Sequence, residues 1–142
     1  VGGNREHGQE LMDRFLSNMQ DLKRVRNGVE EAAKRGKIKG IDGRHLHIRH
    51  AHAALNTLIQ GAGASICKDW LINMTARINK SGLDAKLVAS VHDEYQFEVD
   101  KKDVIKFGEI TKEAIKDTEK GLGLNCPLDN TWKEGTTWAD TH

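Results

Sequence analysis

The stretch LVASVHDEYQFEV, residues 87–99, decides the fold because two strand-like segments flank a short polar centre. The alternating apolar positions are Leu87, Ala89, Val91, Tyr95, Phe97 and Val99. Alternation with a period of two is typical of half-buried β-strands. The polar centre, His92-Asp93-Glu94, fits a turn. We therefore predict an antiparallel hairpin with two adjacent acids at its tip.

Upstream of this hairpin, apolar residues recur with the period of about 3.6 residues that is typical of helices. This period predicts one amphipathic helix over residues 9–35, with Gly36 as its stop, and a long helix over residues 50–80 that ends at Ser81-Gly82. Between the two helices, the Asp42-Gly43 turn predicts a short hairpin or extended connector over residues 37–49.

Downstream of the hairpin, the pattern predicts a last helix, with Asp100 as its cap and Gly121 and Gly123 as its end. Residues 124–142 have no clear period. The order of elements predicts an α+β fold, with long helices packed on a small antiparallel β-hairpin sheet. We expect helices to cover one side of that sheet.

The composition indicates a soluble globular protein with one modest domain. Its 142 residues are 30% charged and 37% hydrophobic. The net charge of +1 excludes a generally polybasic chain, but residues 34–49 are locally basic and favour an anionic partner. Two cysteines without CxxC spacing indicate a reducing compartment. No segment approaches the roughly 20 apolar residues of a membrane span, so we expect no membrane partner and a cytoplasmic location.

The acids at the predicted hairpin tip suit a hard divalent cation. Asp93 and Glu94 would be held at a tight turn between two strands, and Mg²⁺ prefers carboxylate and phosphate oxygens. A two-metal site for phosphoryl transfer usually needs carboxylates from two strands, and this sequence has only one such strand. The same two acids also fit an ordinary polar turn.

A row of polar side chains precedes the small residues of the long helix. His52, Asn56 and Gln60 are four residues apart and would share one helix face. Amides donate and accept hydrogen bonds, which suits base edges, although a solvated polar face has the same spacing. The small residues at 61–65 predict a close approach, and we expect the hairpin tip to pack there.

These motifs together resemble the last third of a family A DNA polymerase, the family of bacterial DNA polymerase I and the T-odd phage replicases. They are DGR at 42–44, HAALNTLIQG at 52–61, SVHDE at 90–94, QFEV at 96–99 and WADTH at 138–142. They occur in the family's order, and the opening residues 1–23 resemble the segment after the nucleotide-binding fingers helix of the phage enzymes. The resemblance covers essentially the whole chain.

The resemblance implies a metal-dependent nucleotidyltransferase. Asp93 would be the catalytic carboxylate that helps to hold the Mg²⁺ ions of a two-metal site, with Glu94 beside it in a supporting role. This chain would supply only part of that site. The expected function is template-directed nucleotidyl transfer in DNA replication, with deoxynucleoside triphosphates as substrates.

The resemblance also implies contacts with primer-template DNA. Asn56 and Gln60 would contact the terminal base pair from the minor groove, and His92 would lie near the primer end. His52 would meet the template strand, where many relatives have arginine.

The same resemblance implies a division into residues 1–43, the distal fingers helix and connector, and residues 44–142, the C-terminal part of the palm. The family's Asp-Tyr-Ser-x-x-Glu pattern and its Arg/Lys/Tyr fingers helix are not found in these 142 residues. We therefore expect a fragment or one subunit of a split polymerase, inactive alone, whose partner is the rest of the enzyme: the missing palm strand, fingers and thumb. A phage-encoded parent would work in the host cytoplasm.

Two other functions remain open from the residues alone. The first is a non-catalytic nucleic-acid-binding module that uses the amide row and the basic connector. The second is a small metal-dependent hydrolase that uses the hairpin tip and the clustered histidines, which are His45, His47, His50 and His52. The sequence upstream of residue 1 would separate these functions from a polymerase.

Overall fold

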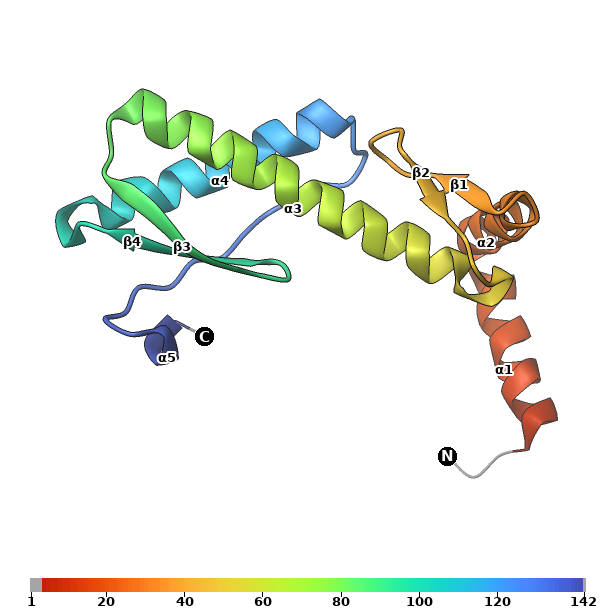
Figure 1. Ribbon diagram of the computed structural model, residues 1–142. Coiled ribbons are helices and arrows are strands. Elements are labelled where there is room, and N and C mark those ends of the chain that lie inside the picture. Colours follow the sequence, from red (N-terminus) through yellow and green to blue (C-terminus); the bar gives the residue numbers. More distant parts are fainter. Residues whose placement is uncertain (1–3, 142) are drawn as a thin grey trace. The chain divides into compact units, whose positions relative to one another are not determined.

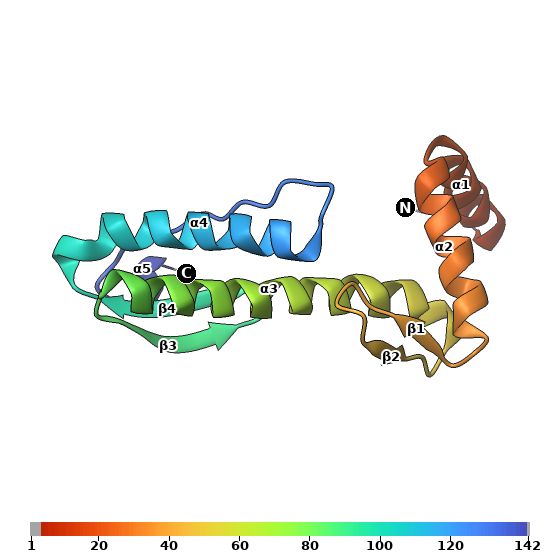
Figure 2. The same ribbon diagram turned by 90° about the horizontal axis from the view of Figure 1, so that it is seen from above.

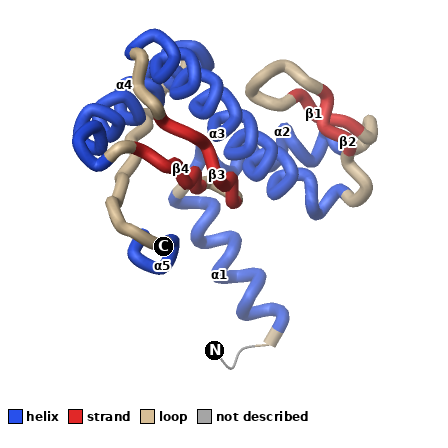
Figure 3. The backbone as a smooth tube through the Cα atoms, turned by 60° about the vertical axis from the view of Figure 1, so that its left-hand side comes forward, coloured by secondary structure: helices blue, strands red, loops and turns tan. Residues whose placement is uncertain are grey.

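The computed structural model describes residues 4–141, and the chain divides into two compact units, residues 1–61 and 62–142. Helix α3, Ala54–Ser81, begins in the first unit and ends in the second (Figure 1). The chain is mostly helical, and its strands form two separate hairpins (Figure 3). This confirms the predicted α+β class. In the described part of the chain, no helix is both long enough and apolar enough to cross a lipid bilayer.

The first unit contains two helices, a short hairpin and a helical turn before α3. These elements are α1, Arg5–Asn18; α2, Gln20–Ala33; β1, Lys37–Lys39; β2, His45–His47; and the 3-10 helix η1, Ala51–Ala53. Its core contains Val29, Ala33, Ile38 and Ala54. The partly buried apolar residues that pack against this core come from α2, the β1–β2 hairpin with the residue that follows it, and the start of α3.

The single helix predicted over residues 9–35 is wrong, because the chain leaves the helical conformation at Met19 (φ −122°, ψ 70°). Ser17 and Asn18, which precede the break, are poor helix formers because their side chains compete for backbone hydrogen bonds. The Ser17 hydroxyl donates to the Arg14 carbonyl at 2.7 Å, and the Gln20 side chain donates to the Ser17 carbonyl at 2.6 Å. These local bonds stabilise the end of α1.

The helical period over residues 9–35 rests on apolar residues of which several are exposed; they are Leu11, Phe15, Met19, Leu22, Val25 or Val29, and Ala32. Leu11, Phe15 and Val25 keep between 47% and 51% of their surface exposed. The residues that the unit buries on the same two helices are Leu16, Val29 and Ala33. Of the residues on which the predicted helix rested, Leu11, Phe15 and Val25 are thus largely exposed, whereas Val29, the alternative to Val25, is buried.

The predicted turn at Asp42-Gly43 closes the β1–β2 hairpin. The strands are antiparallel and pair Lys37 with His47, Ile38 with Leu46 and Lys39 with His45. Gly43 has a φ of +82°, a conformation that favours glycine. Because Ile38 is buried and its cross-strand partner is half-buried, the lysines and histidines of the hairpin lie on the opposite, exposed face.

The second unit contains the other hairpin and the helices that cover it. Its elements after α3 are β3, Ala85–Val91; β4, Glu94–Val99; the 3-10 helix η2, Lys101–Asp103; α4, Val104–Leu122; and the short α5, Trp138–Thr141. Helices α3 and α4 run side by side in this unit, and the hairpin packs against them (Figures 1 and 2). One side of the small sheet is thus covered by helices, as predicted.

The core of the second unit joins both helices to the strands. Met74 and Ile78 of α3 are buried together with Ile110 and Ala114 of α4. The strands add aromatic rings: Phe97 contacts Phe107 with ring centroids 4.9 Å apart, and Tyr95 contacts Trp70 edge-on at 5.4 Å. Such ring pairs contribute about 0.5–1.5 kcal/mol beyond their buried area.

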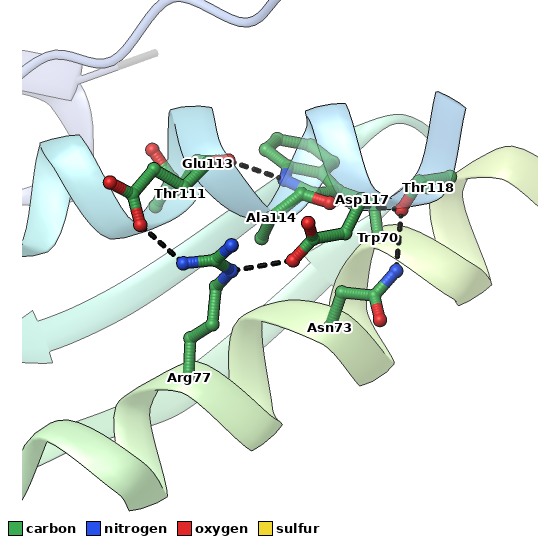
Figure 4. A network of polar contacts seen from close by, with 8 residues as sticks. All are labelled: Trp70, Asn73, Arg77, Thr111, Glu113, Ala114, Asp117 and Thr118. Carbon is green, nitrogen blue, oxygen red and sulfur yellow. Dashed lines mark hydrogen bonds and ion pairs between the residues drawn. The ribbon is translucent and has the colours of Figure 1, made fainter. Parts of the chain in front are cut away.

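Polar contacts along one side of this core fix α4 against α3 (Figure 4). The Arg77 guanidinium of α3 donates to Asp117 at 2.6 Å and also pairs with Glu113. The hydrogen bond from Arg77 is the main reason that the pKa of Asp117 lies below its ordinary value. Two further bonds connect the helices, from the Trp70 indole to the Thr111 carbonyl at 3.0 Å and from Asn73 to the Thr118 hydroxyl at 2.9 Å.

The ends of α4 differ in detail from the prediction. Asp100 precedes η2 and makes no capping hydrogen bond with its side chain, which instead pairs with Lys102 at 3.0 Å. Gly121 lies inside the helix, and Gly123, with a φ of +62°, ends it. The left-handed conformation at Gly123 explains why the second glycine is the stop.

Candidate nucleic-acid and metal site

The tip of the β3–β4 hairpin is a two-residue turn, His92-Asp93, between the paired residues Val91 and Glu94. His92 has a φ of +53°, and among residues 4–141 it is the one non-glycine residue with a positive φ. Turns of this length need positive φ at a central residue, and histidine tolerates it better than most side chains. The turn therefore presents the Asp93 carboxylate on a short and conformationally restricted segment.

A β-bulge lies close to this turn. The register shifts between Leu87 and Ala89 and leaves Val88 as the extra residue of β3. Bulges bend the strand and often re-aim side chains near functional sites. The bulge accounts for the exposure of Val88, which keeps 63% of its surface exposed despite its apolar side chain.

Of the three polar residues predicted for the tip, only His92 and Asp93 form the turn, because Glu94 pairs with Val91 as the first residue of β4. His92 and Asp93 are exposed, whereas Glu94 is half-buried. The Gln96 side-chain amide donates to a carboxylate oxygen of Glu94, and its carbonyl oxygen accepts from the Thr141 hydroxyl at 3.1 Å. The supporting acid of the predicted pair thus accepts a bond from Gln96 of β4, and Gln96 in turn accepts one from Thr141 of α5.

The hairpin is anchored to α3 beside Cys67. The Tyr95 hydroxyl donates to the Cys67 carbonyl at 2.8 Å, and burial raises the pKa of Tyr95. Burial, and secondly the nearby charge of Asp93, raises the pKa of the Cys67 thiol.

The close approach predicted at residues 61–65 has a different partner. A Cβ atom at Gly61 would lie 2.9 Å from Leu46 Cδ1, so the contact at Gly61 is with strand β2. A Cβ atom at Gly63 would meet no atom within 4 Å among the described residues. At Gly63, which belongs to the same unit as the hairpin, the prediction that the hairpin tip requires a glycine is wrong.

The acids of the tip fit only a part of a metal site. Within residues 4–141, no group of three or more histidine, cysteine, aspartate or glutamate side chains could hold a metal ion. Asp93 and Glu94 have suitable oxygens for Mg²⁺, but a complete ligand set needs further donors. The clustered histidines do not provide a metal site either, and His50 and His52 stack on one another with centroids 5.5 Å apart.

The residues of the predicted polar row, which are His52, Asn56 and Gln60, are exposed in the structure. His52 lies in η1, and Asn56 and Gln60 follow on the first turns of α3. All three side chains are exposed and are available to a partner. They belong to the first unit, whereas His92 and Asp93 belong to the second.

Sequence reasoning missed the part played by the C-terminal tail. A cavity of about 810 Å³ in the second unit is lined by Asp93, Glu94, Gln96, Trp132, Trp138 and Thr141, among others. The tail entered the sequence analysis only through the WADTH motif of the family resemblance, and its residues were given no role, because they have no helical or strand period. A further signal was the Thr136-Thr137 pair upstream of Asp140, which is the spacing of a local capping turn. His142, the last residue of the WADTH motif, lies outside the described residues.

Comparison with known sequences finds a family and several relatives. The model of DNA polymerase family A matches residues 1–140. The chain is 34% identical to a DNA-directed DNA polymerase of Enterobacteria phage T3 and 30% identical to DNA polymerase I of Bacillus subtilis. These matches cover 100% and 99% of the chain, but only 23% and 17% of the two relatives.

Comparison with solved structures finds the same kind of fold. The POL domain of Pol1 from M. smegmatis, solved in complex with DNA primer-template and dNTP, superposes with a TM-score of 0.72. The match covers 81% of this chain and 23% of the other, at 24% sequence identity.

Proposed function

The chain belongs to DNA polymerase family A, and from this premise we propose that it forms part of the palm of a DNA-directed DNA polymerase. The reaction would be template-directed nucleotidyl transfer, in which the primer 3′-hydroxyl attacks the α-phosphate of a deoxynucleoside triphosphate and pyrophosphate leaves. The observation that carries this proposal is the family match over residues 1–140, which includes the hairpin with Asp93 at its tip.

Asp93 is proposed as the catalytic carboxylate and metal ligand, and Glu94 as its supporting acid. Mg²⁺ ions, when bound, would activate the attacking oxygen and stabilise charge on the leaving oxygen. Asp93 is exposed on a restricted two-residue turn, which suits a ligand that must meet a metal and a substrate phosphate. Because the described residues lack a complete ligand set, the remaining ligands would come from another part of the polymerase.

The polar row is proposed as the contact with primer-template DNA. Asn56 and Gln60 are exposed amides on one face of α3, and they could reach hydrogen-bond acceptors in the minor groove of the terminal base pair. His52 would contact the template strand, and His92 would lie near the primer end. The exposed lysines and histidines of the β1–β2 hairpin would add sequence-independent attraction to phosphates.

The division of labour along the chain is also a proposal. Residues 1–43 would form the distal fingers helix and connector, and residues 44–142 the C-terminal part of the palm. The partners would be primer-template DNA, deoxynucleoside triphosphates and the remainder of the polymerase. The substrates named for the M. smegmatis structure support this kind of partner.

The experiment that tests this proposal is single-nucleotide primer extension with Mg²⁺. The chain would replace the matching segment of the phage T3 polymerase, and the chimera would be compared with its Asp93→Asn variant and with the 142-residue chain alone. We expect extension by the chimera and a loss of about 100-fold or more in Asp93→Asn, because asparagine keeps the shape but not the charge of a metal ligand. DNA binding in a gel shift should survive this substitution.

Two results would contradict the proposal. Normal extension by Asp93→Asn would remove this residue from the metal site. Robust extension by the 142-residue chain alone would show that no further carboxylates are needed. An Asp100→Asn variant is a matched control, because Asp100 is also exposed and near the hairpin but lies at the other end of β4.

A further inference from the structure

Glu94 and Gln96 lie two residues apart on β4, so their side chains are on the same face of the strand. The Gln96 amide nitrogen donates to Glu94, and the Gln96 carbonyl oxygen accepts from the Thr141 hydroxyl of α5 at 3.1 Å. We propose that Gln96 is a positioning residue of the candidate active site, which holds the Glu94 carboxylate in one orientation and is itself held by Thr141. This inference rests on the proposed function of the hairpin tip.

The chemistry of the three groups allows one arrangement of the Gln96 amide. An ionised carboxylate only accepts hydrogen bonds, so the amide must turn its nitrogen toward Glu94. Its carbonyl oxygen then faces Thr141, whose hydroxyl can donate. With the amide reversed, two oxygen atoms would face each other at Glu94. The Glu94 carboxylate therefore selects this orientation, and the Thr141 hydroxyl, which also lies 3.1 Å from the Trp138 carbonyl, is compatible with it.

The end of the chain that carries Thr141 is held in place by a compact turn. The Asp140 carboxylate accepts from the backbone N–H groups of Thr136 and Thr137 at 2.9 and 2.8 Å, and from their hydroxyls at 3.2 and 3.0 Å. These bonds, first of all the one from the Thr137 backbone, lower the pKa of Asp140. Gly135 is required here, because a Cβ atom at that position would lie 2.3 Å from Asp140 Cβ.

A neutral amide is well suited to this position. A lysine or arginine beside Glu94 would place a positive charge next to Asp93, the proposed metal ligand, and would compete with the cation there, whereas glutamine orients Glu94 without adding positive charge. The bond also offsets the cost of keeping an acid half-buried next to Asp93. Gln96 itself is half-buried and lines the same cavity as the two acids.

The first test uses NMR on the 142-residue chain, which needs no catalysis. Thr141→Val keeps the shape of the side chain and removes its hydroxyl, and Thr141→Ser keeps the hydroxyl. We expect the Gln96 side-chain amide signals and the Glu94 carboxyl carbon signal to shift in Thr141→Val and to stay in place in Thr141→Ser. Slow exchange of the Thr136 and Thr137 amides in both variants would show that the tail turn is intact. Unmoved Glu94 signals in Thr141→Val would overturn the inference, whatever the protein's activity.

The second test measures primer extension in the chimera described above. Replacing Gln96 by methionine, which keeps the length but not the donor, should lower kcat by about 10-fold with the KM for the nucleotide nearly unchanged, the size of effect expected for a residue that supports the surroundings of a metal ligand. Gln96→Glu should lower kcat further, because it places a second carboxylate against Glu94. Unchanged kcat in both variants, in a chimera that is active and sensitive to Asp93→Asn, would overturn the positioning role and leave the proposed function standing. An inactive parent chimera would instead count against the proposed function, and the NMR result would stand separately.

Discussion

The indole of Trp132 occupies the space that a side chain at position 108 would need: a Cβ atom on Gly108 would lie 2.3 Å from Trp132 Cε2. Gly108 is buried on α4, and Trp132 lies in the tail after that helix. The missing side chain thus creates the place where the tail packs on α4.

The first prediction is that Gly108→Ala destabilises the chain by about 1–3 kcal/mol, the usual cost of overfilling a packed contact. Trp132 would be displaced, so its fluorescence should move to longer wavelength in a variant that keeps only this tryptophan. Gly121→Ala is the matched control on the same helix. A Cβ atom there meets no described atom within 4 Å, so alanine should stabilise the helix by up to about 1 kcal/mol. Equal urea midpoints for the two variants would contradict the packing argument.

The second prediction concerns the positive φ of His92. Asparagine tolerates this conformation, whereas valine, which is branched at Cβ, is strained in it. We expect His92→Asn to unfold at the same urea concentration as the original chain, within error. His92→Val should be less stable by about 1–3 kcal/mol. If the His92→Val variant unfolded at the same urea concentration as His92→Asn, the turn would not hold residue 92 in the left-handed region.

The third prediction is a pH dependence that comes from the Arg77–Asp117 pair. Because the pKa of Asp117 is lowered in the folded chain, the pair stabilises the fold above the ordinary value of 3.8 and loses this effect as the pH falls through the lowered pKa. Asp117→Asn should therefore be less stable than the original chain near pH 7. The difference should shrink below pH 3.8. Urea unfolding at several pH values checks this, and a constant difference from pH 7 to pH 2 would contradict it.

The fourth prediction concerns the amide row. Gln60→Ala should weaken binding of primer-template duplexes by about 2–10-fold, the range expected for one lost hydrogen bond. The loss should be similar for all four terminal base pairs, because purine N3 and pyrimidine O2 present acceptors in the minor groove of each. Fluorescence anisotropy with four duplexes measures this, and Asn79→Ala, an exposed amide elsewhere on α3, is the control. A loss confined to one base pair would indicate a sequence-reading module instead.

The sequence predicted those parts of the fold where the period of apolar residues is decisive. The alternation around His92-Asp93 located the hairpin and its tip, and the helical period located α3 and α4. The break at Met19 was missed because it depends on side chains that bond to nearby carbonyls, and such bonds do not change the apolar period.

The candidate site was predicted only as far as its residues lie in recognisable motifs. The exposed positions of Asn56, Gln60 and Asp93 agree with their predicted roles as contact residues, which remain proposals. The tail could not be predicted, because Thr141 reaches Gln96 across 45 residues of sequence and its turn is fixed by contacts of a single glycine and a single acid. Contacts of this kind leave no repeating pattern in a sequence.

The bulged strand β3 also affects the solubility of the purified chain. In the described part of the chain β3 has one ladder partner, β4, and it exposes 44% of Leu87 and 63% of Val88. An apolar strand edge of this kind is a template for pairing between molecules. The purified chain should therefore self-associate as its concentration rises, through β3. A charged residue in place of Val88 should improve its solubility without disturbing the turn that carries Asp93.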